Sequence, residues 1–374
     1  MFFAMSALVA VGTLVIYSAG NARPEEVFHG LWIANLSTAA VGFLVYFALA
    51  LTDYRRLLGY GAGVFYAAAV VMLVAVLFVG TDRFGGRRWL LFFQPSEIAK
   101  LAVIALLAAV APRLRGVRGF AIAVSIIALP VWLILLEPDL GTTLTLVPAA
   151  ILMLFVARVW RRGLAALLCA GLFLSAAVLG AVGYADRPGT SPELRDRILS
   201  FVPLKNHQIK RVRTFLYPES DRLGSGYTVR QSQIAIGSGG LTGKGFCKGE
   251  SNHLRYLPPA ISINDFIFCV YAEETGFIGS LALLALFALL LAPAGWVAWR
   301  CEDAGGRLLA LGIPTLLFAH VFINIGMSVG LVPVTGVPLP FISSGRTFLM
   351  TVLAGSGLIQ SVSIHGKEKI QWAS

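Results

Sequence analysis

Gly237-Ser-Gly-Gly-Leu-Thr-Gly-Lys-Gly245 opens a junction between polar and apolar sequence, which Leu257-Pro-Pro259 and Asn264-Asp265-Phe-Ile-Phe268 complete. The junction ends the only long polar stretch of the chain and leads directly into a long apolar run. A carboxylate at the edge of a membrane is costly unless something uses or pairs it. We therefore interpret Asp265 as the residue that carries chemistry.

The composition indicates an integral membrane protein. Of 374 residues, 57% are hydrophobic and 13% are charged, with a mean hydropathy of +0.79, which is far from the usage of soluble domains. The four cysteines show no CxxC or Cys/His spacing, so the pattern excludes a zinc site and a disulfide framework. No basic leader precedes the apolar run Met1–Ala19, which predicts a retained span.

Ten apolar stretches approach the ~20 residues that a membrane-crossing helix needs. They predict an all-α polytopic protein, with one membrane domain over residues 1–374 and one long extracytoplasmic loop, 185–265, between spans seven and eight. The predicted spans are 2–19, 29–51, 58–80, 96–112, 119–136, 141–157, 163–184, 266–294, 307–331 and 341–363.

Basic residues in the short loops predict the orientation, because cytoplasmic loops carry the excess of Lys and Arg. One set of loops, with the C-terminal tail, carries twelve basic residues and the opposite set carries four. Both termini are therefore predicted to be cytoplasmic. The twelve are Arg55, Arg56, Arg113, Arg115, Arg118, Arg158, Arg161, Arg162, Arg300, Arg307, Lys367 and Lys369, and the four are Arg23, Arg83, Arg87 and Arg88.

The loop 185–265 is itself basic, with twelve Lys and Arg against seven Asp and Glu. It could be an ordinary solvated face. The basic residues of 210–218 are interleaved with apolar and turn residues, however, and a glycine-rich turn follows them. This favours an anion-binding surface at the membrane interface, suited to a phosphate or a lipid head group.

Charged residues within or beside the spans are the other informative positions. Glu97 and Lys100 lie three residues apart on one helical face and can pair, either to fix helix packing or to line a polar cavity. Glu137 and Asp139 flank a very short turn without a base of their own, so they are expected to meet Lys100 or an arginine of the large loop. Glu273-Glu274 can be structural acids, or they can shape a cavity below Asp265.

The segment Gly330–Arg346 contains three prolines and three glycines, and it cannot form a straight helix. Non-helical backbone at membrane depth is tolerated only inside protein or beside a cavity. We interpret it as a re-entrant or hinge segment next to the active cavity.

The combination of motifs resembles the SEDS family (shape, elongation, division and sporulation), and its elongation members (RodA) more than its division members (FtsW). The resemblance covers most of the chain. It is carried by Gly85-Gly-Arg-Arg-Trp89, Gln94-Pro-Ser-Glu97 with Lys100, Pro138-Asp-Leu-Gly-Thr142, Gly226-Tyr227, Gln231-Ser232, Ala235–Gly245, Asp265–Phe268, Glu273-Glu274, Gly276, Pro333-Val-Thr-Gly336 and Leu339-Pro-Phe341.

The resemblance implies a peptidoglycan glycosyltransferase that polymerises lipid II and releases undecaprenyl diphosphate. It further implies a class B penicillin-binding protein as partner, contact with membrane lipids, no nucleic acid, and a divalent cation (Mg²⁺ or Mn²⁺) whose ligands are unknown. Asp265 matches the catalytic aspartate of the family, and Glu97, Lys100 and Asp139 match its polar cavity residues.

For the reaction, we expect Asp265 to act as general base. An aspartate near its reference pKa of about 3.9 is ionised at neutral pH. Arg211, Arg213 and Lys244 are the loop cations expected to bind the departing diphosphate. Two other functions stay open, a lipid II flippase or transporter and a non-catalytic scaffold of the wall-synthesis machinery.

Overall fold

The computed structural model describes residues 1–21, 30–83, 86–90, 93–137, 139–187, 190–202, 204, 206–221, 224–250 and 262–366. Several residues singled out from the sequence lie outside these ranges, namely Leu257-Pro-Pro259, Gly85, Pro138, Arg23, Lys367 and Lys369.

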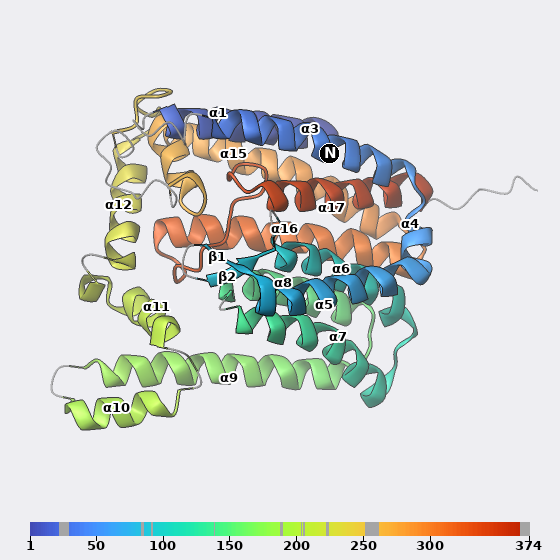
Figure 1. Ribbon diagram of the computed structural model, residues 1–374, viewed down its shortest axis with the longest axis horizontal. Coiled ribbons are helices and arrows are strands. Elements are labelled where there is room, and N and C mark those ends of the chain that lie inside the picture. The colour runs from blue at the N-terminus through green and yellow to red at the C-terminus, as the bar shows by residue number, and fades with distance from the viewer. Residues whose placement is uncertain are drawn as a thin grey trace, which may run out of the picture.

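Long apolar segments form helices that run side by side along the molecule (Figure 1). Within the described ranges, nine helices have the length and hydropathy to cross a membrane, and a shorter apolar helix of 17 residues, sixth in chain order, brings the total to ten. The ten-span prediction is therefore confirmed in number and order. The spans are α1 (Phe2–Asn21), α3 (Leu31–Leu51), α4 to α5 (Tyr54–Val79), α6 (Pro95–Val110), α7 (Gly116–Leu136), α8 (Leu140–Val156), α9 (Arg161–Ala185), α15 (Ile267–Arg300), α16 (Ala304–Val329) and α17 (Arg346–His365).

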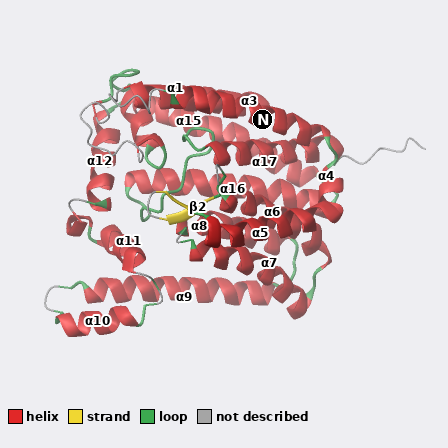
Figure 2. Cartoon of the chain, viewed as in Figure 1, coloured by secondary structure: helices red, strands yellow, loops and turns green. Residues whose placement is uncertain are grey.

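Short elements complete the spans. The third span consists of α4 (Tyr54–Arg56), a π-helical turn (Leu57–Gly61) and α5 (Ala62–Val79), with non-helical backbone at Gly59. A 3-10 turn, Ala111–Arg113, extends α6. Strands β1 (Thr81–Arg83) and β2 (Gly86–Trp89) form an antiparallel hairpin between α5 and α6 (Figure 2).

The helices α6, α16 and α17 form the centre of the bundle, and most of each is buried. Helix α16 packs against α6, α8, α15 and α17. Helix α9, in contrast, lies along the edge and is almost entirely exposed, which is the behaviour expected of a lipid-facing span. The centre accordingly holds the buried pair Glu97–Lys100 of α6 and His320 of α16, which replace water for one another.

The predicted outer loop folds into helices at one end of the bundle (Figure 1). They are α10 (Pro192–Ser200), α11 (Asn206–Leu216), a 3-10 turn (Pro218–Asp221) and α12 (Ser225–Ser238). Helix α12 packs against α15 and α16, and α11 contacts α9 and α12. The loop is therefore a structured cap on that end.

The glycine-rich turn closes a break in α15. At Gly276 the backbone leaves the helical conformation (φ 69°, ψ −164°). The amides of Phe277 and Ile278 donate to the carbonyls of Gly240 and Leu241, at 2.8 and 3.1 Å. In return the amides of Lys244 and Gly245 donate to the carbonyls of Glu273 and Glu274, both at 3.0 Å. These two amides are therefore committed to a helix, and the anion-binding surface predicted from the basic residues of 210–218 stays a prediction.

Two span boundaries differ most from the prediction. Helix α15 continues to Arg300 rather than 294, because Pro293 is accommodated inside the helix. The tenth span begins at Arg346 rather than 341, because residues 330–345 are non-helical. The hydroxyl of Ser343 holds this segment, accepting from the Leu339 amide at 2.8 Å and donating to the Asn264 carbonyl at 2.6 Å. The predicted non-helical segment is thus confirmed, and it lies directly beside Asp265.

Candidate active site at Asp265

Asp265 lies immediately before α15, between α16 and the non-helical segment 330–345. Asn324 of α16 donates its side-chain amide to the carbonyl of Asp265 at 2.8 Å and to that of Val337 at 2.7 Å. Gly336 (φ 75°) faces the carboxylate so closely that an added Cβ would lie 3.2 Å from Asp265 Oδ2. One buried amide and one glycine therefore fix the position of this side chain.

The Asp265 carboxylate is half-buried and accepts no hydrogen bond and joins no ion pair within the described part of the chain. Burial raises the pKa of the Asp265 carboxyl to about 6. The negative charge of Asp139 adds to this rise, and the positive charges of Arg211 and Arg88 oppose it. The expectation of an ordinary aspartate pKa is therefore wrong, because the site is poorly solvated. A carboxylate with this pKa is still mostly ionised at neutral pH and binds a proton more readily than an ordinary aspartate.

Two arginines stand near this carboxylate. Arg211 of α11 is half-buried and donates from Nη1 to the carbonyl of Thr335 at 3.3 Å. Arg88 of β2 donates from Nε to the carbonyl of Glu137 at 3.1 Å. Because Arg211 joins no ion pair within the described ranges, its charge is available to a ligand. It also lines a pocket of about 1020 Å³ between α11, α12 and residues 330–334, whereas Asp265 itself does not line that pocket.

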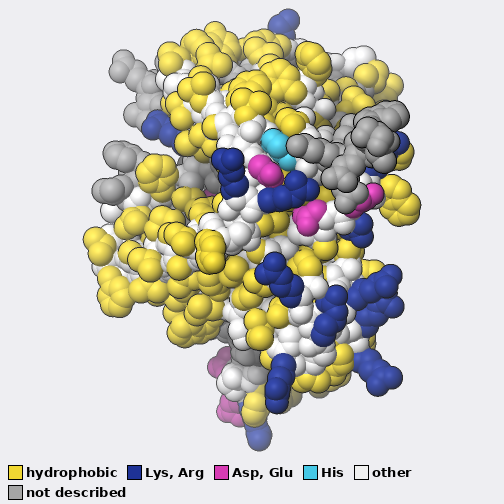
Figure 3. Space-filling model, turned by 90° about the vertical axis from the view of Figure 1, so that its right-hand side faces the viewer, with side chains coloured by type: hydrophobic (Ala, Val, Ile, Leu, Met, Phe, Trp, Pro, Cys, Tyr) yellow, Lys and Arg dark blue, Asp and Glu magenta, His cyan; other side chains and the backbone are white. Residues whose placement is uncertain are grey.

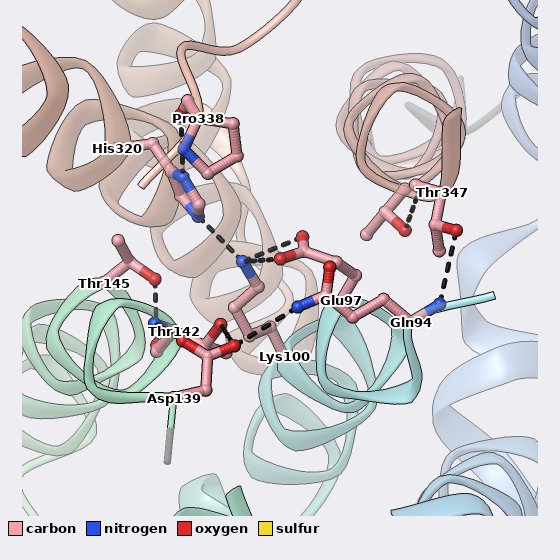
Figure 4. Close-up of polar contacts among 10 residues, drawn as sticks. Gln94, Glu97, Lys100, Asp139, Thr142, Thr145, His320, Pro338 and Thr347 are labelled. Atoms are coloured by element: carbon pink, nitrogen blue, oxygen red, sulfur yellow. Dashed lines mark hydrogen bonds and ion pairs between the residues drawn. The ribbon is translucent and has the colours of Figure 1, made fainter. Parts of the chain in front are cut away.

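Asp139 is close enough to raise the Asp265 pKa, but its own oxygens are occupied. It caps α8, with Oδ1 accepting from the Thr142 amide at 3.1 Å. Its Oδ2 accepts from the Thr142 hydroxyl at 2.8 Å and from the Gln94 side-chain amide at 3.2 Å (Figure 4). The expectation that Asp139 approaches an arginine of the large loop agrees with its electrostatic effect on Arg211.

Glu97 and Lys100 form the predicted pair, deep in the bundle. Lys100 Nζ lies 3.0 and 2.9 Å from the two Glu97 oxygens, with exposed fractions of 1% for Lys100 and 3% for Glu97. Lys100 also contacts His320 Nε2 at 2.8 Å (Figure 4). Because an ammonium only donates, His320 accepts at Nε2 and donates from Nδ1 to the Pro338 carbonyl at 3.3 Å. The pair therefore supports the segment that carries Gly336.

Arg213 and Lys244 are engaged elsewhere. Arg213 Nε pairs with Asp186 at 2.6 Å, which ties α11 to the end of α9. Lys244 Nζ pairs with Glu273 at 2.8 Å and with Glu250 at 3.4 Å. Of the three loop cations predicted to bind diphosphate, only Arg211 acts on Asp265 electrostatically, and the roles of the other two stay predictions.

Glu273 and Glu274 are structural acids. Glu273 also accepts from the Glu250 amide at 3.0 Å, and Glu274 accepts from the hydroxyl of Ser18. Their ties to a backbone amide and a serine confirm the structural alternative considered from the sequence. They hold the glycine-rich turn and α1 against the broken helix.

Four residues of the site were missed as site residues: Arg88, Gln94, His320 and Asn324. His320 and Asn324 are polar side chains inside an apolar span, which is the same signal that identified Glu97 and Lys100. Arg88 and Gln94 lie within motifs quoted above, but nothing in their spacing shows which carboxylate they approach.

No group of three or more His, Cys, Asp or Glu able to hold a metal ion occurs in the part of the chain that the structure describes. Asp139 is the carboxylate that acts on Asp265 electrostatically, and both of its oxygens already accept hydrogen bonds. Mg²⁺ is commonly bound by one or two carboxylates together with substrate phosphates. The residues therefore fit a cation only in company with a phosphorylated ligand.

Comparisons with known proteins identify the family of the chain. The model of the FtsW, RodA and SpoVE family, described as cell cycle protein, matches residues 1–368. The chain belongs to the SEDS family. It is 36% identical over 375 residues to the peptidoglycan glycosyltransferase MrdB of Escherichia coli strain K12, covering 98% of this chain and 93% of the relative.

Two solved structures have the same fold. The first comes from work on the structural coordination of polymerization and crosslinking by a peptidoglycan synthase complex. It superposes with a TM-score of 0.75 at 30% identity, and the match covers 98% of both chains. The other is the rod shape determining protein RodA of Thermus thermophilus, with a TM-score of 0.68 at 28% identity, covering 98% of this chain and 97% of that one.

Proposed function

We propose that this chain is a peptidoglycan glycosyltransferase that polymerises lipid II at the outer face of the cytoplasmic membrane during cell elongation. Family membership over nearly the whole chain supports the activity. The observation that carries the mechanism is the Asp265 carboxylate, which is poorly solvated, lacks a hydrogen-bond partner within the described ranges, and stands near the free cation of Arg211.

In the proposed reaction, a sugar hydroxyl of incoming lipid II attacks the anomeric carbon of the growing strand. Asp265 takes the hydroxyl proton as the new C–O bond forms, a contribution typically worth 10²–10⁴-fold. The bond from the anomeric carbon to the diphosphate breaks, and its electron pair leaves with undecaprenyl diphosphate. Arg211 and Arg88 stabilise the charge that gathers on the leaving oxygens, because both cations are already in place.

A divalent cation would add positive charge at the leaving diphosphate. Phosphate oxygens of the substrate would be its main ligands, and Asp265 is a described carboxylate without a hydrogen-bond partner that could help hold it. The chain's own contribution is to keep one free carboxylate and two guanidinium groups at the same end of the bundle.

The membrane arrangement follows from the charge bias. With the basic short loops in the cytoplasm, both termini are cytoplasmic, and α10, α11 and α12 lie outside. The superposed chain of the peptidoglycan synthase complex supports a partner for this one. We propose that the partner is a class B penicillin-binding protein, which crosslinks the strands.

Polymerisation of lipid II by purified protein in detergent tests the proposal. Wild-type protein should form glycan polymer, and Asp265→Ala and Asp265→Asn should not, with Tm and elution volume unchanged. Detergent removes any membrane to cross, so a flippase or a scaffold would give no polymer. Wild-type levels of polymer from both variants would rule out Asp265 as general base.

A further inference from the structure

A second pocket lies at the end of the bundle remote from Asp265. Asp265 precedes α15, and the pocket lies beyond the other end of α15, between the starts of α7 and α16 and the turn that joins α8 to α9. Its volume is about 730 Å³. Four arginines from these segments line it, together with Phe155 and other apolar residues; they are Arg115, Arg158, Arg161 and Arg307.

The pocket wall contains no acid, and the four arginines join no ion pair within the described ranges. Arg307 donates to the Cys301 carbonyl at 2.9 and 3.1 Å, and the Arg161 guanidinium lies 5.8 Å from the centre of the Phe155 ring. Figure 3 shows Lys and Arg side chains gathered on this end of the molecule, with few Asp and Glu among them. The pocket is therefore strongly positive.

Two other arginines at this end have contacts of their own. Arg55 lies 3.8 Å from Asp53, and Arg300 stacks over Trp296 at 4.4 Å. The topological rule requires only that positive charge accumulate on one side of the membrane. It does not require four arginines from three separate segments to converge on one hollow.

The backbone at Arg158 gives an independent reason to assign a role to its side chain. Helix α8 ends with the amide of Val159 donating to the Leu154 carbonyl and that of Arg158 donating to the Phe155 carbonyl. This is the Schellman arrangement, in which the residue in the left-handed conformation is usually glycine. Here it is arginine, with φ 54°. An unfavourable backbone conformation held by a non-glycine residue points to a use for the side chain.

We infer that this pocket binds the phosphate group of an anionic phospholipid. Guanidinium groups bind phosphate oxygens in bidentate fashion and are favoured wherever phosphate is recognised. Basic pockets between membrane helices at the interface suit lipid head groups. Phe155, with 53% of its surface exposed, provides an apolar wall beside the arginines, which a lipid would use and a free phosphate would not.

Native mass spectrometry of the full chain in detergent tests this inference, using phosphatidylglycerol and the zwitterionic phosphatidylethanolamine as probes. Wild-type protein should prefer phosphatidylglycerol by at least about tenfold. Arg115→Gln/Arg158→Gln/Arg161→Gln should reduce the preference to about twofold or less. Arg113→Gln/Arg118→Gln/Arg162→Gln removes the same charge outside the pocket and should keep it. Equal loss in both triple variants, or loss in neither, would overturn the site.

Arg158→Gly separates binding from folding. The glycine relieves the left-handed conformation, so Tm should stay the same or rise while the preference for phosphatidylglycerol falls severalfold. Lower Tm with unchanged preference would contradict the role of this side chain.

A titration with inorganic phosphate distinguishes a phospholipid head group from a free phosphate ion as the ligand of the pocket. If millimolar phosphate raises the wild-type Tm, fails to do so for the pocket triple variant, and no lipid preference is found, the phospholipid is ruled out as the source. Retention of phosphatidylglycerol in the presence of that phosphate would support the lipid.

Discussion

Asp265 and Glu273 lie eight residues apart at the same end of the bundle, yet their surroundings differ completely. Glu273 accepts from Lys244 at 2.8 Å and from the Glu250 amide at 3.0 Å. The Asp265 carboxylate accepts from no described residue and stands in a poorly solvated position near Arg211. A saturated carboxylate holds structure, whereas an unsaturated one retains the capacity to take a proton from a substrate.

Exchanging each acid for its amide should give opposite results. Asp265→Asn should reduce polymerisation by about 10²–10⁴-fold with little change in Tm, because only the proton acceptor is removed. Glu273→Gln should retain most activity but lower stability by about 1.5–3 kcal/mol, because a charged hydrogen-bond acceptor is lost. Polymer assays and thermal unfolding of both variants measure this contrast. If both variants lost activity and stability to the same extent, the two acids would not have different roles.

Glu97 differs from both acids, because its buried carboxylate is neutralised by the ammonium group of Lys100. Lys100→Met leaves Glu97 buried without its cation and should destabilise the protein by about 3–5 kcal/mol. The double variant Glu97→Gln/Lys100→Met should recover most of that loss, because neither charge then remains unpaired. Thermal unfolding in detergent gives both values. Equal stability of the single and double variants would show that the pair is not coupled.

Substitutions in the glycine-rich turn test how much the contacts of this turn with Glu273 and Glu274 contribute to stability. At Gly243 (φ 80°) an added Cβ would lie 2.1 Å from the Glu274 carbonyl oxygen, whereas at Gly240 (φ 55°) it would meet nothing within 4 Å. Gly243→Ala should therefore cost more than about 2 kcal/mol, and Gly240→Ala only the 1–2 kcal/mol of the left-handed conformation. Gly237→Ala, within α12 and also without a neighbour, is the control and should be neutral or stabilising. The order of the three Tm values checks the turn's role in closing the break at Gly276.

Hydropathy and charge bias predicted the ten spans, because both signals are local to the sequence. The pair Glu97–Lys100 was also predictable, since residues three apart share a helical face. The choice between Arg211 and Arg213 was not. Two residues correspond to about 200° of helical rotation, so these side chains leave α11 on opposite faces, and only the packing of α11 shows which face meets residue 335.

Lys244 illustrates the same limit over a longer distance. Its partner Glu273 lies on α15 just before the break at Gly276. The geometry of that break depends in turn on the glycine-rich turn, which contains Lys244 itself. The local sequence shows which residue types are present in this cluster. Which of them pair depends on how the glycine-rich turn packs against α15.

The smallest expected effect concerns pH and acts on Asp265 alone. A general base is active when deprotonated, so the polymerisation rate should rise with pH through about 6, the pKa that burial gives Asp265. Arg211→Gln removes a charge that lowers this pKa, so the rise should move to higher pH. Asp139→Asn removes a charge that raises it, so the rise should move to lower pH, while asparagine can still cap α8.

Rate–pH profiles of the three proteins measure these shifts, each expected to be about one unit or less, or about 1.4 kcal/mol. Glu273→Gln is the matched control and should leave the midpoint unchanged, because Glu273 does not contribute to the Asp265 pKa. Shifts of the same sign in the Arg211 and Asp139 variants would mean that the titrating group is not Asp265. Opposite signs would not follow from a general loss of stability, since both substitutions remove one charge from the same cluster.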